Sequence, residues 1–532
     1  MALSLLIHGL QVTATAEHFH NTDEGLILRG QYVSLEPPLP AIRQYIHGWQ
    51  SWSLTTWLNA GRTLPPSFPY RLHPLQLDPA YARHPLPHSA WVGALEFADG
   101  TVLLLGALGL EAHIEYSGGT MRGWYESGHG EWLAAYGTES QVFATYASAL
   151  AGRLGKRREV PAPRVWCSWY SYFGHPDETS LGLDLEGLGG IPFDVFQVDD
   201  GWQQDIGDWE PNARFPAGMD GFARQIRAGG FIPGLWLAPL IAVPSSRLFK
   251  EHTDWFLHDE QGELVSAGHN WGKRVYALDP TQPAVLEWLA ALMQRVRSWG
   301  YDYAKLDFLY AGGLPGVRHN NIPRETSLRL ALQTLRESLG NAYLLTCGVP
   351  ILPTLGLCDG LRIGPDVASH WVSSLESETL YNFATPGAQN AIRTSLGRLW
   401  LRPLVHTDPD VVFFRSIHLS LTAEQKGLLQ DLAVIAGFRG TSDLVRWLTP
   451  DEREALCQFL GAEPRVRRLD RYRYQLNQRE VDFAPHIDLP PQRVFEAGRV
   501  KRFVQGRSNS ERVLTLAHGY DRFSERRRLT KK

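Results

Sequence analysis

Residues 301–310 read YDYAKLDFLY, a pattern that predicts a buried β-strand with charged side chains inside it. Side chains alternate between the two faces of a strand, so Lys305 and Asp307 share one face and their apolar neighbours share the other. A buried charge without a partner is strongly disfavoured, so the charged pair is expected to face a cavity. There the ammonium group would favour the ionised form of Asp307 and keep it ready as a nucleophile. For an isolated pair of this kind, a structural salt bridge at a strand end is the alternative.

Similar strands alternate with amphipathic segments on both sides of this stretch. The segment 283–298, for example, places its apolar residues on one helical face. Strand candidates begin at Val165, Phe193, Phe231, Tyr301, Tyr343 and Leu361, with weaker candidates at 401–408 and 432–436. Strand–helix units over this length predict an α/β fold of the (β/α)8 TIM-barrel type. A doubly wound sheet is the alternative, but no Gly-rich phosphate-binding sequence follows the first strand.

The barrel is predicted to lie between two β-rich parts. Short β-like runs separated by turn residues predict an N-terminal antiparallel β-sandwich over 1–160. A basic stretch followed by prolines forms the expected linker to the catalytic barrel at 161–460. The alternating residues 472–476 and the run 512–516 predict a small C-terminal β domain over 461–532.

Composition limits the classes of partner. The chain has 532 residues, a formal net charge of −4 and 44% hydrophobic residues, so we expect a soluble multidomain protein with no nucleic-acid partner. Its four cysteines lack a C-x-x-C spacing, which argues against a disulfide framework or a zinc ribbon. The first residues lack a signal-peptide pattern and no apolar run reaches transmembrane length, so a cytoplasmic location without membrane contact is expected. The sequence leaves open whether the chain forms a homo-oligomer.

The second predicted strand ends in two adjacent carboxylates, Asp199 and Asp200. Such a pair can chelate a metal or accept hydrogen bonds from neighbouring sugar hydroxyls. A metal site needs further ligands, and no histidine motif of suitable spacing is present. We therefore expect sugar hydroxyls there and neither a metal nor another cofactor, with a helix N-cap as the structural alternative. The chain's 18 tryptophans fit this hypothesis, because indole rings pack on the apolar faces of sugars.

Other strand ends add an aromatic wall and small residues. In a TIM barrel the carboxyl ends of the strands form the face that carries the active site. Trp236, on the third strand, is expected to form a wall of the cavity opposite the acids. Cys347 and Gly348 close the fifth strand with small groups that leave room for a ligand. Cys347 is expected to be a spacer, because no histidine lies in a position to activate it as a nucleophile.

The sixth strand repeats the arrangement of a basic residue followed by an acid. Arg362 and Asp366 share its face, as Lys305 and Asp307 share that of the fourth strand. Two carboxylates that flank a pocket with a tryptophan wall are the apparatus of glycoside hydrolysis. Asp366 is the better proton donor, provided that Arg362 is directed at the sugar, because a nearby guanidinium would lower the pKa of this acid. A salt bridge at the barrel mouth is the alternative role of Arg362.

These motifs together give the chain a family resemblance. It resembles the compact bacterial α-galactosidases of glycoside hydrolase family 36 (melibiases), which share a clan with lysosomal α-galactosidase. The motifs that carry the resemblance are HGWQSWS (47–53), VDDGW (198–202), GDW (207–209), GLWLAP (234–239), YALD (276–279), AKLDFL (304–309), RIGPD (362–366) and DPD (408–410). Many members have an asparagine before the DPD motif, whereas this chain has His406 and Thr407 there. The length of the N-terminal part is that of the family's short forms rather than of its tetrameric ones.

The resemblance implies a role for each candidate residue. Asp307 would be the nucleophile that forms a β-galactosyl-enzyme, and Asp366 would be the acid and then the base of a retaining reaction. The implied substrate-binding residues are Asp199 and Asp200 for the 4-OH and 6-OH, Lys305 for the 3-OH and 4-OH, Arg362 for the 2-OH region, Trp236 for the ring, and Cys347, Gly348 and Trp202 beside them. One tryptophan of the N-terminal loop, Trp49 or Trp52, would also reach the site, with domain-interface packing as the alternative for each.

These observations predict a retaining, exo-acting α-galactosidase that releases terminal α-D-galactosyl residues from oligosaccharides such as melibiose and raffinose. Two alternatives share the same site: an α-N-acetylgalactosaminidase, which depends on the room near the 2-OH, and an α-galactosyl transglycosylase. A non-catalytic sugar-binding barrel is the alternative of a different class. Such a protein would be expected to have lost Asp307 or Asp366, and the sequence retains both.

Overall fold

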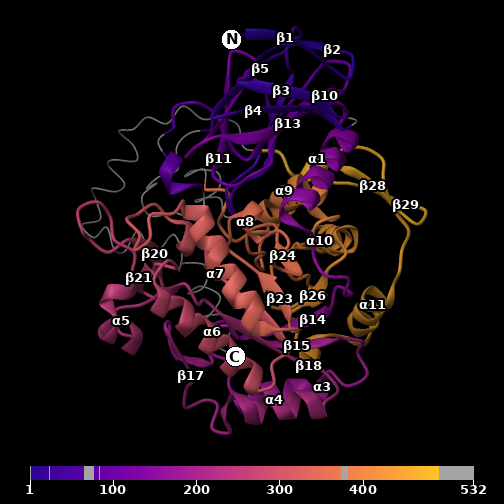
Figure 1. The fold of residues 1–532 in the computed structure, drawn as a ribbon. Helices are drawn as coiled ribbons and strands as arrows, with labels where there is room; N and C mark the ends of the chain where they lie inside the picture. Colours follow the sequence, from indigo (N-terminus) through magenta and orange to yellow (C-terminus); the bar gives the residue numbers. More distant parts are fainter. Residues whose placement is uncertain (1, 23, 65–76, 83, 373–381, 490–532) are drawn as a thin grey trace, which may run out of the picture.

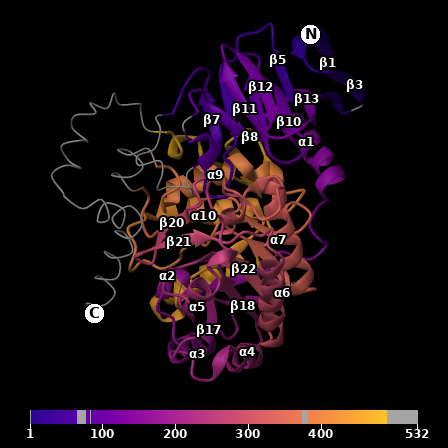
Figure 2. The ribbon, with the colours of Figure 1, turned by 60° about the vertical axis from the view of Figure 1, so that its left-hand side comes forward.

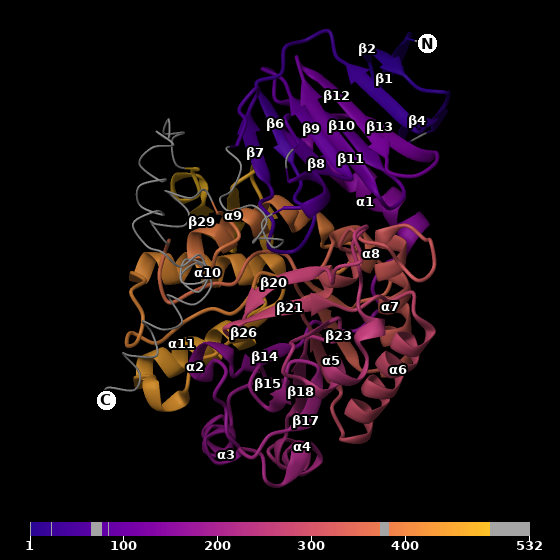
Figure 3. The same ribbon diagram turned by 90° about the vertical axis from the view of Figure 1, so that its left-hand side faces the viewer.

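The protein, described here by a computed structural model of residues 2–22, 24–64, 77–82, 84–372 and 382–489, has three parts. Two N-terminal β-sheets lie over one end of a barrel, and a small C-terminal sheet lies at the side (Figures 1 and 3). No helix among the described residues combines the length and apolar character needed to cross a membrane.

The N-terminal part is a sandwich of two antiparallel sheets, as predicted. The six-stranded sheet has the order β1 (Ala2–Ile7), β2 (Leu10–Thr15), β5 (Tyr32–Glu36), β12 (Thr120–Tyr125), β11 (Ala112–Ser117) and β8 (His88–Ala90). The seven-stranded sheet has the order β3 (His18–Thr22), β4 (Gly25–Gly30), β13 (Gly130–Thr138), β10 (Thr101–Ala107), β9 (Val92–Glu96), β6 (Arg43–Ile46) and β7 (Thr56–Asn59). The two sheets approach closely where the Trp132 ring covers Gly123. A Cβ atom at position 123 would lie only 2.7 Å from this ring, so the contact requires glycine.

Helix α1 (Glu139–Leu154) connects the sandwich to the barrel. It begins directly after β13 with a capping box formed by Thr138 and Gln141, which satisfies two backbone N–H groups at the helix start. Its buried face packs on the sandwich, where the Tyr146 hydroxyl donates a hydrogen bond of 2.8 Å to the carbonyl of Ala107. The helix therefore belongs to the sandwich in packing although it leads into the barrel.

Eight parallel strands form the predicted TIM barrel. Their order is β25 (His406–Asp408), β24 (Gly360–Arg362), β23 (Tyr343–Thr346), β22 (Tyr303–Leu306), β18 (Ile232–Leu237), β15 (Val195–Val198), β14 (Arg164–Cys167) and β26 (Arg439–Thr441). A parallel bridge between Val412 and Thr441 joins the two edges of this sheet. The sandwich lies against the carboxyl ends of the strands. In one such contact, the Ser51 N–H donates to the carbonyl of Val349, just beyond β23.

Helices surround the barrel strands (Figure 2). They are α2 (Trp169–Tyr172), α3 (Glu178–Gly187), α4 (Gly218–Ala228), α5 (Arg247–Glu251), α6 (Pro283–Ser298), α7 (Arg324–Leu339), α8 (Ile351–Thr354), α9 (Ala388–Arg398), α10 (Ala423–Ala436) and α11 (Pro450–Gly461). The predicted amphipathic helix at 283–298 is confirmed as α6, whose predicted apolar face is buried. Two small antiparallel sheets extend from the loops: β16 (Gln203–Asp205) with β17 (Asp208–Pro211), and β19 (Ile241–Ala242), β21 (Lys273–Ala277) and β20 (Ser266–Asn270).

The prediction of a closing strand at 432–436 is wrong. These residues form the last turns of α10, which has a capping box at Thr422 and Gln425 and ends at Gly437 in the left-handed conformation. The closing strand is β26, a few residues later. A short apolar run does not distinguish a buried strand from a buried helical segment by its periodicity, and here the two caps decide.

The C-terminal part has a three-stranded antiparallel sheet of β27 (Val466–Arg468), β28 (Arg473–Leu476) and β29 (Arg479–Asp482). The predicted alternation at 472–476 is confirmed as β28, whereas the predicted strand at 512–516 lies outside the described residues. Arg471 ties this sheet to the sandwich through Glu96 and Glu139, at 2.9 and 2.6 Å.

Candidate active site

Lys305 forms its ion pair with Asp199. The Lys305 Nζ atom lies 2.9 Å from Asp199 Oδ2, and Gln197 Nε2 donates to the same oxygen at 2.6 Å. Burial alone would lower the pKa of Lys305, but the charge of Asp199 more than compensates and raises it. The expected pairing of the ammonium group with Asp307 is therefore wrong. The long Lys305 side chain reaches a different strand end, where it balances the buried carboxylate of Asp199.

Asp307 is held by two neutral N–H donors. The Trp236 indole donates to Oδ2 at 3.1 Å, and the backbone N–H of Phe308 donates to Oδ1 at 2.7 Å. Phe308 has a φ of +54°, a left-handed conformation that turns the chain at this strand end. Trp236 thus lies beside Asp307 and orients its carboxylate, and its role as a wall of the sugar cavity stays a prediction.

Asp366 has the environment of a proton donor. Its side chain retains 19% of its exposure, and its Oδ1 atom lies 3.3 Å from Arg362 Nη1. Burial raises the pKa of Asp366 most, the negative charge of Asp410 raises it further, and the resulting pKa is about 7. Arg362 opposes this shift without cancelling it. The carboxyl group can therefore hold a proton near neutral pH while staying reachable from solvent.

Arg362 is bound by three carboxylates, so the expectation that it is directed away from Asp366 is wrong. Its Nε lies 3.0 Å from Asp408 Oδ2, and its Nη2 lies 2.8 Å from Asp410 Oδ1. Arg362 and Asp408 are register partners on the neighbouring strands β24 and β25, which explains their contact. The alternative of a salt bridge at the barrel mouth is the one that the structure bears out.

Asp410 and Tyr170 are two functional candidates that sequence reasoning missed. Asp410 Oδ2 accepts hydrogen bonds from the Tyr170 hydroxyl and from the Val367 N–H, the latter at 2.9 Å. The second acid of the DPD motif was the available signal for Asp410, whereas no sequence pattern pointed to Tyr170. Both residues lie in the shell that supports Asp366 and Arg362.

Trp271 was also missed. It lies at the turn of the β20–β21 hairpin, and its indole donates to Asp200 Oδ2 at 2.7 Å. Its ring centroid lies 6.4 Å from that of Trp236 and 5.3 Å from that of Phe308. The hairpin therefore carries a second aromatic ring to the site. The signal available in the sequence was a tryptophan between two turn residues, Asn270 and Gly272.

Cys347 and Gly348 lie directly beside Asp307. A Cβ atom on Gly348 would lie 3.0 Å from Asp307 Oδ1 and 3.3 Å from the ring of Trp52, and the φ of Gly348 is +51°. Glycine is therefore required here both for space and for conformation. Burial raises the pKa of the Cys347 thiol well above its usual value, which fits an inert spacer.

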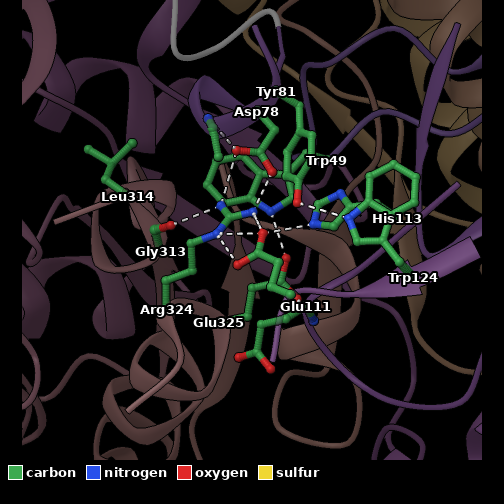
Figure 4. A network of polar contacts seen from close by, with 12 residues as sticks. Trp49, Asp78, Tyr81, Glu111, His113, Trp124, Gly313, Leu314, Arg324 and Glu325 are labelled. Carbon is green, nitrogen blue, oxygen red and sulfur yellow. Dashed lines mark hydrogen bonds and ion pairs between the residues drawn. The ribbon is translucent and has the colours of Figure 1, made fainter. Parts of the chain in front are cut away.

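The structure brings Trp52, and not Trp49, close to Phe308 and Gly348, next to Asp307. Trp52 packs edge-on against Phe308 with ring centroids 5.6 Å apart. Trp49 instead donates to Glu325 Oε1 at 2.8 Å, and its ring centroid lies 5.0 Å from the guanidinium carbon of Arg324 (Figure 4). Domain-interface packing therefore accounts for Trp49.

Trp202 does not line the site, so its assignment as a substrate-binding residue is wrong. Its ring is fully buried between Trp209 and Trp299, with centroids 6.2 and 5.9 Å away. Its indole donates to the backbone carbonyl of Trp236 at 2.9 Å. Trp202 thus supports Trp236 from behind, a role that its position in the VDDGW motif did not reveal.

One cluster of described residues, Asp78, His113 and Glu126, has ligand atoms within 4.8 Å of one another, as a metal site would require. Arg324 already lies among them: its Nη1 atom is 3.1 Å from Asp78 Oδ1 (Figure 4). Its Nη2 atom is 2.6 Å from Glu126 Oε1. Its guanidinium neutralises both carboxylates, so this junction between sandwich and barrel is a salt-bridge network rather than a metal site.

Comparisons with known proteins agree with this geometry. The melibiase family model matches residues 141–333. The α-galactosidase AgaA of Geobacillus stearothermophilus is 28% identical over 207 residues, which cover 36% of this chain and 27% of AgaA. The α-galactosidase 1 of Pediococcus pentosaceus is 28% identical over 34% of this chain and 26% of its own length. The chain thus spans about a quarter of the length of these curated relatives.

Solved structures give a closer match. TtGalA, an α-galactosidase from Thermus thermophilus in complex with p-nitrophenyl α-D-galactopyranoside, superposes with a TM-score of 0.87 at 44% identity, covering 91% of this chain and 99% of TtGalA. The crystal structure of AgaA shares the fold, with a TM-score of 0.57 at 15% identity over 85% of this chain and 65% of AgaA. The chain is a glycoside hydrolase and belongs to the melibiase family, the α-galactosidases of glycoside hydrolase family 36.

Proposed function

We propose that this protein is an exo-acting α-galactosidase that hydrolyses terminal α-D-galactosyl residues with retention of configuration. The contrast between its two central carboxyl groups carries the proposal. Asp307 accepts hydrogen bonds from two N–H donors, so its carboxylate oxygens are held in one orientation beside the site. Asp366 has a pKa raised to about 7, first by burial and then by the charge of Asp410. One group is therefore suited to attack and the other to donate a proton.

In the first step, a carboxylate oxygen of Asp307 would attack the anomeric carbon from the face opposite the leaving group. Asp366 would protonate the glycosidic oxygen as the bond from the anomeric carbon to that oxygen breaks, and the leaving alcohol would depart. The product would be a β-galactosyl ester of Asp307. The two hydrogen bonds to Asp307 hold its carboxylate in the orientation that this attack requires.

In the second step, the ionised Asp366 would take a proton from water while the water oxygen attacks the anomeric carbon. The bond to Asp307 would break, the nucleophile would regain its charge, and the released galactose would have the α configuration. Asp366 would then be protonated again, ready for another cycle. A pKa near 7 suits a group that must donate a proton in one step and accept one in the next.

Substrate recognition would come from groups that surround these two acids. The Lys305–Asp199 pair and Asp200 offer charged donors and acceptors for sugar hydroxyls. Trp236, Trp271 and Trp52 offer aromatic surface for the apolar face of the ring. We assign the 4-OH and 6-OH to Asp199 and Asp200.

We propose melibiose and raffinose as representative substrates. The similarity to TtGalA supports this choice, since that enzyme has been solved in complex with stachyose as well as with p-nitrophenyl α-D-galactopyranoside. Ligands of this kind, an α-galactoside and an oligosaccharide, match a site with several hydroxyl-binding groups and a wall of indole rings.

A panel of p-nitrophenyl glycosides tests the proposal. The wild type should hydrolyse the α-galactoside, and Asp307→Ala should lose about three orders of magnitude or more in kcat. Azide should partly restore the variant and give β-galactosyl azide, because the small anion can occupy the position of the missing carboxylate. Asp302→Ala is the matched control, since Asp302 lies just before the same strand and pairs with Arg297 and Arg227.

Three outcomes would overturn parts of this assignment. An undiminished rate in Asp307→Ala would end its role as the nucleophile. Faster cleavage of the α-N-acetylgalactosaminide would leave the mechanism and change the substrate. Sugar binding by the wild type without turnover of any α-glycoside would favour the non-catalytic alternative.

A further inference from the structure

The last residue of α9, Arg398, is enclosed by backbone carbonyl groups. Its side chain is fully buried, and its two terminal nitrogens donate to five carbonyl oxygens. Four of these belong to the N-terminal loop 48–53, and the fifth, of Ile363, follows β24. These acceptors are Ser51 O, Ile363 O at 2.9 Å, Gly48 O at 3.0 Å, Gln50 O at 2.8 Å and Ser53 O at 2.9 Å.

Arg398 differs from Arg362, another buried arginine of the barrel mouth. Arg362 is neutralised by carboxylates, whereas Arg398 has no carboxylate partner within the described ranges of the chain. Burial accordingly lowers the pKa of Arg398 to about 9. A buried cation is tolerated only when polar groups surround it, so the carbonyls of the loop must stay where the guanidinium needs them. The guanidinium of Arg398 therefore holds four carbonyl groups of this loop in place.

The same loop is attached to the barrel next to the nucleophile. The Ser51 N–H donates to Val349 O at 3.0 Å, and the Val349 N–H donates back to Ser51 Oγ at 3.1 Å. Val349 directly follows Gly348, whose position leaves no room for a Cβ atom beside Asp307. Loop and catalytic strand end are thus held in fixed register.

This loop presents Trp52 to the site. Trp52 is 6% exposed, and a Cβ on Gly348 would lie 3.3 Å from its ring and 3.0 Å from Asp307 Oδ1. Among the described residues, its buried indole N–H has no hydrogen-bond partner. Because no hydrogen bond to a described residue fixes the ring, the position of Trp52 depends on the loop that carries it.

We propose that Arg398 is a positioning residue that acts through Trp52. By gathering the carbonyls of loop 48–53, Arg398 holds the Trp52 indole beside Asp307 and so makes a segment of the N-terminal domain part of the sugar site. This inference rests on the proposed α-galactosidase function and adds to it a residue that would not itself contact the substrate.

A double-mutant cycle with Arg398→Lys and Trp52→Ala tests the inference on p-nitrophenyl α-galactoside and melibiose. A lysine ammonium has three donors, so it cannot reproduce the five contacts. Arg398→Lys should lower kcat/KM at least tenfold. In the Trp52→Ala background the same change should cost less than about threefold, because the indole through which it acts is already absent. If the losses of kcat/KM caused by Arg398→Lys and by Trp52→Ala simply multiply in the double variant, the proposal is wrong.

Arg393→Lys is the matched control for general destabilisation. Arg393 lies on the same helix, is 1% exposed, and also donates to backbone carbonyls, Ile487 O at 2.6 Å and Asp488 O at 3.0 Å. Those carbonyls belong to the C-terminal part and not to the loop 48–53. Arg393→Lys should lower the melting temperature but keep kcat/KM within about twofold. An equal loss of activity in the two lysine variants would show that Arg398 has only a structural role.

A milder variant covers the case in which Arg398→Lys does not fold. Ser51→Ala removes the hydroxyl that accepts from Val349 N, and it should give a smaller loss of kcat/KM that also disappears in the Trp52→Ala background. A loss that persists there, or no loss at all, would overturn the inference.

The proposed function and the positioning role fail in different ways. If the wild type hydrolyses α-galactosides but the free-energy effects of Arg398→Lys and Trp52→Ala are additive, only the positioning role of Arg398 is refuted. If the wild type binds galactose but does not hydrolyse α-galactosides, only the hydrolase function is refuted. The coupling between Arg398→Lys and Trp52→Ala would then be measured from the galactose dissociation constants of the variants. A wild type that neither binds nor hydrolyses would end both.

Discussion

Glu325, at the junction of sandwich and barrel, and Asp366, at the barrel mouth, are both carboxyl groups whose pKa is raised toward neutrality. The pKa is about 8 for Glu325 and about 7 for Asp366, and burial is the largest cause in each case. Glu325 is fully buried and accepts from Trp49 Nε1 at 2.8 Å, Trp91 Nε1 at 3.0 Å and Glu111 N at 2.6 Å. Asp366 keeps 19% exposure, and its carboxyl group contacts Arg362 at 3.3 Å.

The comparison shows that a raised pKa alone does not identify a catalytic acid. A structural carboxyl group and a catalytic one can share the same electrostatic cause, namely burial. They differ in what else surrounds them. The donors around Glu325 come from the N-terminal domain and enclose it, which suits a group that joins two domains (Figure 4). Asp366 is reachable and lightly bonded, which suits a group that exchanges protons with a substrate.

Replacing Asp366 should have the largest effect. Asp366→Asn should lower kcat for melibiose by about 10²–10⁴-fold, the usual contribution of a general acid. The loss should be smaller for p-nitrophenyl α-galactoside, because nitrophenolate departs with little help from a proton. Steady-state kinetics on both substrates measure the difference, and equal losses on the two would contradict the role as acid. The melting temperature should change little, because the carboxyl group is only lightly bonded.

The pH dependence of the reaction should show an intermediate effect. Because Asp366 must be protonated to donate, kcat/KM should fall as the pH rises above about 7. Asp410→Asn removes a negative charge that raises the pKa of Asp366, so the basic limb of the profile should move to lower pH. A shift of about one pH unit would lower the rate by about tenfold on that limb. A basic limb that is unchanged in Asp410→Asn would refute this electrostatic coupling. Asp431→Asn is the control, since Asp431 is paired with Arg479.

Replacing Glu325 should have the smallest effect on activity and a visible one on stability. Its pKa is about 8 in the folded protein against an ordinary value of 4.5, so the folded state retains a proton that the unfolded state loses between these values. Stability should therefore decrease as the pH rises from about 4.5 to 8, and Glu325→Gln should remove this dependence because an amide does not titrate. Urea unfolding at pH 5 and pH 8 measures the slope. Activity should stay within about threefold, and a larger loss would place Glu325 in the catalytic machinery.

Local sequence patterns determined the fold and the identity of the two central carboxyl groups. Alternation along strands, amphipathic periodicity and the acids at strand ends are properties of neighbouring residues, so the barrel and the placement of Asp307 and Asp366 could be predicted without knowledge of distant contacts. The strand at 432–436 was the exception, because a short apolar run fits a helix or a strand equally well and the caps of α10 decided for the helix.

Only the tertiary structure decided which charge balances which and which aromatic ring reaches the site. Lys305 pairs with Asp199, 106 positions away, and not with Asp307 on its own strand. Trp52 packs against Phe308, next to Asp307, while Trp49, three residues earlier, donates to Glu325. Trp202 is buried behind Trp236. These pairings depend on how strands and loops meet at the barrel mouth, where side chains from distant segments compete for the same partners. That competition is a property of three-dimensional packing, and no local pattern encodes its outcome.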